Sequence, residues 1–96
     1  MAETSVNVPT DPRASYFIVS KTKLANGNLQ VVSRRVGPSG TSYSRREINC
    51  GGMRFRYTGE GDTLSEINQP YSKGAMGPLT EGSISTYIAL AACRGR

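Results

Sequence analysis

Two runs of strand-forming residues joined by a pair of glycines stand at the centre of the chain. Residues 43–50 and 53–58 alternate apolar and polar positions, and Gly51-Gly52 between them can take the positive φ angles of a tight two-residue turn. In the resulting hairpin Glu47 would face Arg56 as a cross-strand ion pair. The buried face would carry Ile48, Cys50, Met53 and Phe55, and the solvated face Glu47, Asn49, Arg54 and Arg56.

A second hairpin is predicted nearer the N-terminus. Two apolar runs, ASYFIVS from Ala14 and LQVVSRRV from Leu29, flank Asn26-Gly27, which is a strong hairpin signal. A two-residue loop at this pair would set Leu24 opposite Leu29. Further along the hairpin the same register places Val19 opposite Arg34, so we expect a bulge or bend within residues 20–23.

Three segments lack a strand pattern. Residues 1–13 hold two prolines and few apolar side chains, which predicts a flexible leader or a short edge strand. Residues 36–42 (VGPSGTS) predict a mobile, turn-rich link. Residues 59–82 are polar, and within them Leu64 and Ile67 would anchor either a short helical turn or a brief strand. A long connection of this kind is often a binding surface.

Helical spacing of apolar residues predicts a helix within residues 80–93, with Ser83 as its N-cap. The apolar positions are Ile84, Tyr87, Ile88 and Ala91, extended to one side by Leu90 and Cys93. We therefore predict an α+β fold, in which a small antiparallel sheet of four to six strands has one C-terminal helix packed on it.

Length and composition limit the architecture further. A chain of 96 residues allows one domain, which we place at residues 14–96 behind a leader of residues 1–13. Eleven glycines and five prolines favour short strands over a helical bundle. No apolar run is long enough to predict a transmembrane segment, and residues 1–11 lack the apolar core of a signal peptide. We therefore expect either a cytosolic protein or a mature form trimmed before Met1.

Cys50 and Cys93 are the only two cysteines, and an even pair fits one disulfide. Such a bridge would close a long loop and contribute about 4 kcal/mol of stability in the chain-entropy model. The alternative is two free, buried thiols in a cytosolic protein. Two cysteines without any histidine cannot supply the four ligands of a zinc site.

The charge favours anionic partners. Twelve Lys and Arg against seven Asp and Glu give a formal charge of +5. Nucleic acid is less favoured than an anionic protein or polysaccharide, because Phe55 and Tyr57 would lie on the opposite face of their strand from the neighbouring arginines. The alternative is an ordinary solvated sheet face. The residues of the predicted basic patch are Arg34, Arg35, Arg45, Arg46, Arg54 and Arg56.

Catalytic chemistry is hard to place on this chain. It has no histidine, so the usual proton shuttle near neutral pH is missing and a cysteine nucleophile would lack its base. The glycine-rich stretches lack the Lys-Ser/Thr ending of a phosphate loop. Glu60-Gly61-Asp62 is typical of a solvated acidic turn and not of a calcium loop. We predict a non-enzymatic protein with no cofactor and no metal site.

Several short motifs occur together in a known order. They are a YFIV strand from Tyr16, a Gly27-Asn28 step, SRREINC from Ser44, RFR from Arg54, and a Gly82-Ser83 helix start followed by Cys93. This arrangement resembles the bacterial surface-adhesin protein E-like family, which comprises small exported proteins of Gram-negative bacteria. The resemblance implies an antiparallel sheet joined to a C-terminal helix by a disulfide, here between Cys50 and Cys93. The best-studied members bind host matrix proteins, and most members have no known function.

These observations together predict an exported, periplasmic or cell-surface protein. It would bind an anionic protein or polysaccharide, a host matrix protein or an envelope component through the basic sheet face or the segment of residues 59–82. One alternative is an inhibitor or regulator of a cell-envelope enzyme that uses residues 37–43 as a plug, since SGTSY from Ser39 is similar to a loop of periplasmic lysozyme inhibitors. Another is a cytosolic nucleic-acid-binding domain, which would require free thiols.

Overall fold

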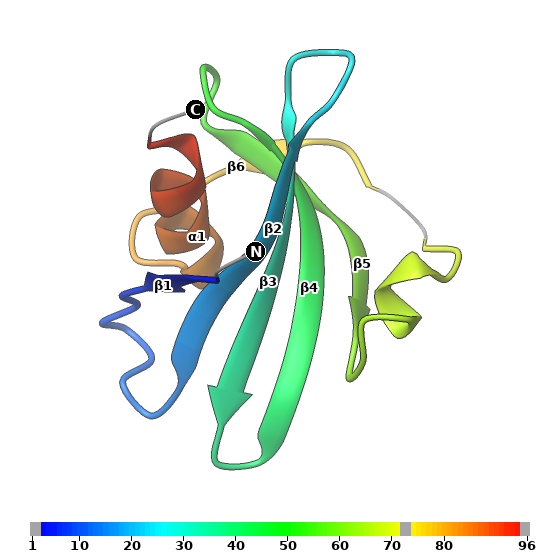
Figure 1. Cartoon of the computed structure of the whole chain (residues 1–96). Coiled ribbons are helices and arrows are strands. Elements are labelled where there is room, and N and C mark those ends of the chain that lie inside the picture. Colours follow the sequence, from blue (N-terminus) through cyan, green and yellow to red (C-terminus); the bar gives the residue numbers. More distant parts are fainter. Residues whose placement is uncertain (1–2, 72–73, 95–96) are drawn as a thin grey trace.

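Six antiparallel strands follow one another across a single sheet in chain order, and one helix covers one of its faces (Figure 1). This computed structural model describes residues 3–71 and 74–94. The elements are β1 (Thr4–Val6), β2 (Ser15–Lys23), β3 (Leu29–Gly37), β4 (Gly40–Asn49), β5 (Arg54–Gly61), the short 3-10 helix η1 (Glu66–Asn68), β6 (Gly77–Pro78) and α1 (Ile84–Cys93). The predicted fold class is confirmed.

The central hairpin keeps the predicted register but has a different turn. Glu47 pairs with Arg56. The strands end at Asn49 and resume at Arg54, so the turn has four residues. Its residue with positive φ is Met53 (φ 51°) and neither central glycine. The Asn49 side chain accepts a hydrogen bond from the Gly52 N–H (2.9 Å), which stabilises this wider turn. Met53 is exposed as a result, so its predicted burial is wrong.

The β2–β3 hairpin differs from the prediction by one residue of register. Lys23 pairs with Leu29. The next pair toward the turn closes the loop, because the Leu24 N–H donates to the Asn28 carbonyl (2.8 Å). Gly27 has φ 89°, so a single left-handed residue completes the turn. The expected bulge exists, but it lies between Ile18 and Ser20 and not within residues 20–23.

The N-terminal residues belong to the sheet. Thr4–Val6 pairs with the first half of β2 as an edge strand. Val6 and Val8 are buried in the core cluster, so residues 4–8 are not a flexible leader. The edge-strand alternative is the correct one, because these two valines supply the apolar surface that holds the segment in place.

The predicted link of residues 36–42 is also strand. Gly37 pairs with Gly40 across a tight turn of Pro38 and Ser39, and Gly40 takes φ 125°. Its turn composition therefore indicated the hairpin tip correctly but not the length of the flanking strands. The 59–82 segment contains η1 around Ile67, then β6 on the far edge of the sheet. Of the two alternatives given for Leu64 and Ile67, the helical turn is correct; Ile67 anchors it, whereas Leu64 is exposed and its predicted role as an anchor is wrong.

The core lies between α1 and the sheet. Ser83 caps the helix as predicted, and its side chain accepts from the Thr86 N–H (3.2 Å). The buried face is turned relative to the prediction, and Leu90 is exposed. The residues of α1 that are buried are Ser85, Ile88, Ala89 and Ala92. Small side chains at three of these four positions bring the helix close to the sheet, which explains why this face and not the bulkier one packs inward.

Cys50 and Cys93 form the disulfide, with their Cα atoms 5.7 Å apart. The bridge joins the turn after β4 to the last turn of α1, and both cysteines are half-buried against the core. This confirms the predicted staple between sheet and helix. Such a disulfide favours a protein that works outside the reducing cytosol.

Candidate functional site

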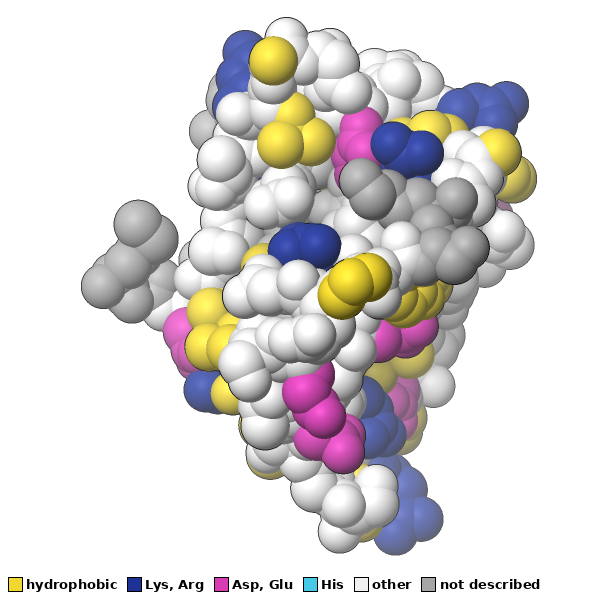
Figure 2. Space-filling view, turned by 90° about the vertical axis from the view of Figure 1, so that its right-hand side faces the viewer, with side chains coloured by type: hydrophobic (Ala, Val, Ile, Leu, Met, Phe, Trp, Pro, Cys, Tyr) yellow, Lys and Arg dark blue, Asp and Glu magenta, His cyan; other side chains and the backbone are white. Residues whose placement is uncertain are grey.

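The six arginines of the predicted patch do not share one surface. Side chains alternate along a strand, so Arg35 and Arg46 fall on the side of α1, whereas their neighbours point to the opposite side. We call this opposite side, which α1 does not cover, the open face. Figure 2 views the molecule from the open face and shows basic side chains separated by acidic and polar ones. The patch residues on the open face are Arg34, Arg45, Arg54 and Arg56.

Arg46 is part of the core. It is only 3% exposed and donates to Ser85 on α1 (3.0 Å) and to Ser33 on β3 (2.8 Å). Its guanidinium also lies 4.8 Å from the centre of the Tyr57 ring. Among the described residues, the partners of the Arg46 guanidinium are thus hydroxyl groups and an aromatic ring, and not a carboxylate. Arg46 ties the sheet to the helix and cannot reach a ligand.

Arg34 and Arg35 fix the N-terminal segment. Arg35 donates to Asp11 (3.1 Å), and the Tyr16 hydroxyl donates to the same carboxylate (2.6 Å). The hydrogen bond from Tyr16, with help from Arg35, lowers the pKa of Asp11. Arg34 forms an ion pair with Glu3 (2.6 Å). Both arginines therefore hold residues 3–11 against the sheet, and their charges are compensated within the chain.

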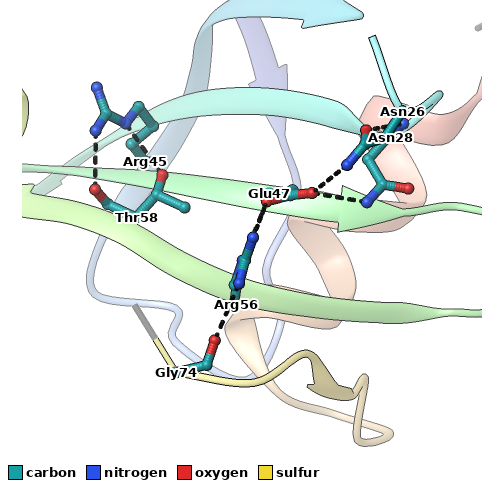
Figure 3. Close-up of polar contacts among 7 residues, drawn as sticks. All are labelled: Asn26, Asn28, Arg45, Glu47, Arg56, Thr58 and Gly74. Carbon is teal, nitrogen blue, oxygen red and sulfur yellow. Dashed lines mark hydrogen bonds and ion pairs between the residues drawn. The ribbon is translucent and has the colours of Figure 1, made fainter. Parts of the chain in front are cut away.

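Glu47 is the centre of a polar network on the open face (Figure 3). It is buried, and it accepts hydrogen bonds from Asn28 (2.7 Å), Asn26 (3.0 Å) and both Nε and Nη2 of Arg56 (3.0 and 2.8 Å). These hydrogen bonds, that from Asn28 foremost, lower the pKa of Glu47 from 4.5 to about 2. The ion pair with Arg56 was predicted, but the two asparagines were not. Only the pairing of β3 with β4 brings them to Glu47.

Three arginines of the open face hold the 59–82 segment. Arg45 donates to the Thr58 carbonyl (2.9 Å) and to the side chain of Asn68 (3.0 Å). Arg56 donates to the Gly74 carbonyl (3.3 Å) and Arg54 to that of Met76 (3.4 Å). The two regions predicted separately as binding surfaces are therefore one. We call Arg45, Arg54, Arg56 and the described residues of this segment (59–71 and 74–82) the arginine surface.

The 3-10 helix η1 packs closely on this face, on the opposite side of the sheet from α1 (Figure 1). Ile67 is the buried residue of η1. Gly59 lies directly against the Ile67 backbone, and a Cβ at this position would overlap the Ile67 carbonyl oxygen. Only glycine allows this approach, which fixes where the segment crosses β5.

We expect Gly59→Ala to lower the free energy of unfolding by about 2 kcal/mol, because backbone atoms must move apart to admit the methyl group. Urea unfolding followed by circular dichroism measures the change. Gly77→Ala is the matched control, since nothing lies within 4 Å of a Cβ there. Equal stabilities of the two variants would contradict the close packing of η1.

Arg54 is the least engaged arginine of the surface. It is exposed, and among the described residues its side chain makes one hydrogen bond, a long one to the Met76 carbonyl. The surface is hollowed nearby, where Arg56, Tyr57 and Tyr71 help to line a cavity of about 310 Å³. Tyr71 donates to Glu60 (2.7 Å), which raises the pKa of the Tyr71 hydroxyl. Guanidinium donors beside aromatic side chains suit a sulfate or carboxylate on a larger molecule.

The described residues contain neither a metal-binding cluster nor a membrane-spanning helix. Within residues 3–71 and 74–94, no three His, Cys, Asp or Glu side chains lie close enough together to hold a metal ion. In that same portion of the chain, no helix has the length and apolar character required to cross a bilayer. Comparison of the chain with models of known families, with curated proteins and with solved structures finds no match.

Proposed function

We propose that this chain is a non-enzymatic, exported bacterial protein that binds an anionic macromolecule, best an acidic polysaccharide, through the arginine surface. The formal charge of +5 supports an anionic partner. The disulfide supports an oxidising compartment such as the periplasm or the cell surface. The resemblance to the surface-adhesin protein E-like family points to the same kind of protein.

The meeting of Arg45, Arg54 and Arg56 on one surface carries the proposal. Glu47, which pairs with Arg56, is the only carboxylate paired with any of the three within the described residues, and it is itself buried. Arg54 keeps most of its donors for a ligand. Single-stranded nucleic acid is a poorer partner than a polysaccharide, because the disulfide favours a protein that works outside the cytosol.

The test is retention on a heparin column in a salt gradient. We expect Arg54→Gln to elute at lower salt and to bind a soluble heparin fragment about fivefold more weakly, because it removes one charge-assisted contact. Arg13→Gln is the matched control, since it removes one exposed charge from the segment before β2, away from this surface. If both variants elute together, or if the parent protein is not retained, the proposed surface is wrong.

One observation favours the inhibitor as a second candidate. The tip of the β3–β4 hairpin, Pro38 and Ser39, is exposed, and the pairing of Gly37 with Gly40 makes it narrow. A narrow exposed tip is suited to entering a cleft. A screen against envelope hydrolases, with Ser39→Trp to block insertion, would test it. The hypothesis of a cytosolic nucleic-acid-binding domain requires free thiols and is at odds with the disulfide.

A further inference from the structure

The edge of the sheet at β2 is only partly covered. β1 pairs with residues 16–18, whereas β2 continues to Lys23. Within the described part of the chain, residues 19–23 have β3 on one side and no strand on the other. Along an antiparallel strand the backbone N–H and C=O groups of successive residues point alternately to one neighbour and the other. Because the Leu24 N–H points to Asn28, the backbone groups of Lys23 and Lys21 point away from β3, toward the uncovered side. These groups form a template for another strand.

A groove runs beside this open edge. It has a volume of about 420 Å³ and lies between the second half of β2 and the last turn of α1. Ile18, Ala91 and Ala92 give it an apolar lining. The Nζ atom of Lys21 donates to the Ala92 carbonyl (3.0 Å), which places a positive charge at the C-terminal end of the helix. The groove therefore suits every second side chain of an extended peptide whose backbone pairs with the edge of β2.

The charges of the groove are all of one sign. Lys21 and Arg94 line it, Lys23 follows on the same edge, and no Asp or Glu is among its lining residues. Lysines on an edge strand discourage pairing between copies of a basic chain. They attract an acidic strand instead.

We propose that an extended acidic peptide segment of a partner protein adds to the sheet alongside residues 19–23. The backbone of the segment would pair with Lys21 and Lys23, its apolar side chains would enter the groove, and its carboxylates would meet the cations of the rim. A second copy of this chain is a poorer occupant, because each copy carries a formal charge of +5. This site lies on a different part of the molecule from the arginine surface.

Amide hydrogen exchange, measured by NMR on the full chain, tests the proposal. The probe is a capped heptapeptide of alternating Glu and Val, and the control peptide has Lys in place of Glu. We expect the acidic peptide to slow exchange at Lys21 and Lys23 at least tenfold, and the basic peptide to have no effect. Lys23→Glu should weaken peptide binding at least fivefold. Arg54→Glu, on the open face, should leave it unchanged.

Three results would overturn the inference. The first is protection that maps to β5 and not to β2, which would assign the peptide to the arginine surface. The second is equal binding by the parent protein and Lys23→Glu. The third is protection of Lys21 and Lys23 in the free protein, which would mean that this chain already covers its own edge or that of a second copy.

Discussion

Glu47→Gln is expected to lower the free energy of unfolding by about 3 kcal/mol at pH 7. The carboxylate is buried and accepts four hydrogen bonds, from Asn26, Asn28 and Arg56. Its pKa is lowered from 4.5 to about 2, and each pKa unit corresponds to about 1.4 kcal/mol. The variant amide is uncharged, and its N–H groups would face the donors of these partners. Urea unfolding at pH 7 measures the loss.

The same network predicts how stability depends on pH. Because folding lowers the pKa of Glu47, its contribution is fully present above about pH 4.5 and is lost as the pH falls to about 2. The parent protein should therefore lose about 3 kcal/mol more than Glu47→Gln over this range. Glu60→Gln, an exposed carboxylate paired only with Tyr71, serves as the control and should follow the parent. Parallel pH curves for the parent and Glu47→Gln would contradict the network.

Loss of the disulfide is the second large effect expected. Cys50 and Cys93 are 43 positions apart, so opening the bridge should lower the free energy of unfolding by about 4 kcal/mol in the chain-entropy model. The double variant Cys50→Ala/Cys93→Ala and the reduced parent protein should show the same loss in urea unfolding. Alkylation followed by intact mass then counts the free thiols.

The outcome also bears on the compartment. An isolated protein with no alkylated cysteine before reduction would agree with an oxidising location. Two alkylated cysteines, with no change of stability on reduction, would contradict both the bridge and the exported location.

The central hairpin and the helix were predictable because their signals are local. The alternation of residues 43–58 fixes which side chains face each other once the strands are joined by a short turn, and the register with Glu47 opposite Arg56 followed from it. Ser83 marks the helix start through a contact with Thr86, only three residues away. Interactions between residues so close in the sequence depend little on the rest of the fold.

The distribution of the arginines was not predictable in the same way. Whether Arg46 is solvated or buried depends on Ser33 and Ser85, which are brought to it by β3 and α1. A sequence shows that neighbours such as Arg45 and Arg46 point to opposite sides, but not which side the helix will cover. The core position of α1 was decided by the small residues Ser85, Ala89 and Ala92, whose apolar signal is weak.

The β2–β3 turn and the long 59–82 segment were the other sources of error. The β2–β3 turn differed by one residue because Gly27 alone, and not the Asn26-Gly27 pair, supplies the left-handed conformation. The crossing of the 59–82 segment over β5 depends on Gly59 meeting Ile67, a contact that no local pattern indicates. These tertiary contacts are also what created the arginine surface, so the candidate site could be predicted by residue type but not by arrangement.

NMR titration with a heparin-derived oligosaccharide shows whether the arginine surface binds an acidic polysaccharide. We predict that the largest amide and side-chain shifts will fall on Arg45, Arg54, Arg56 and residues 68–71 and 74–77, with the side-chain signal of Arg54 changing most. The affinity should fall steeply as salt is raised. Shifts confined to β2 and the end of α1, or no shifts at all, would mean that the arginine surface does not bind the polysaccharide.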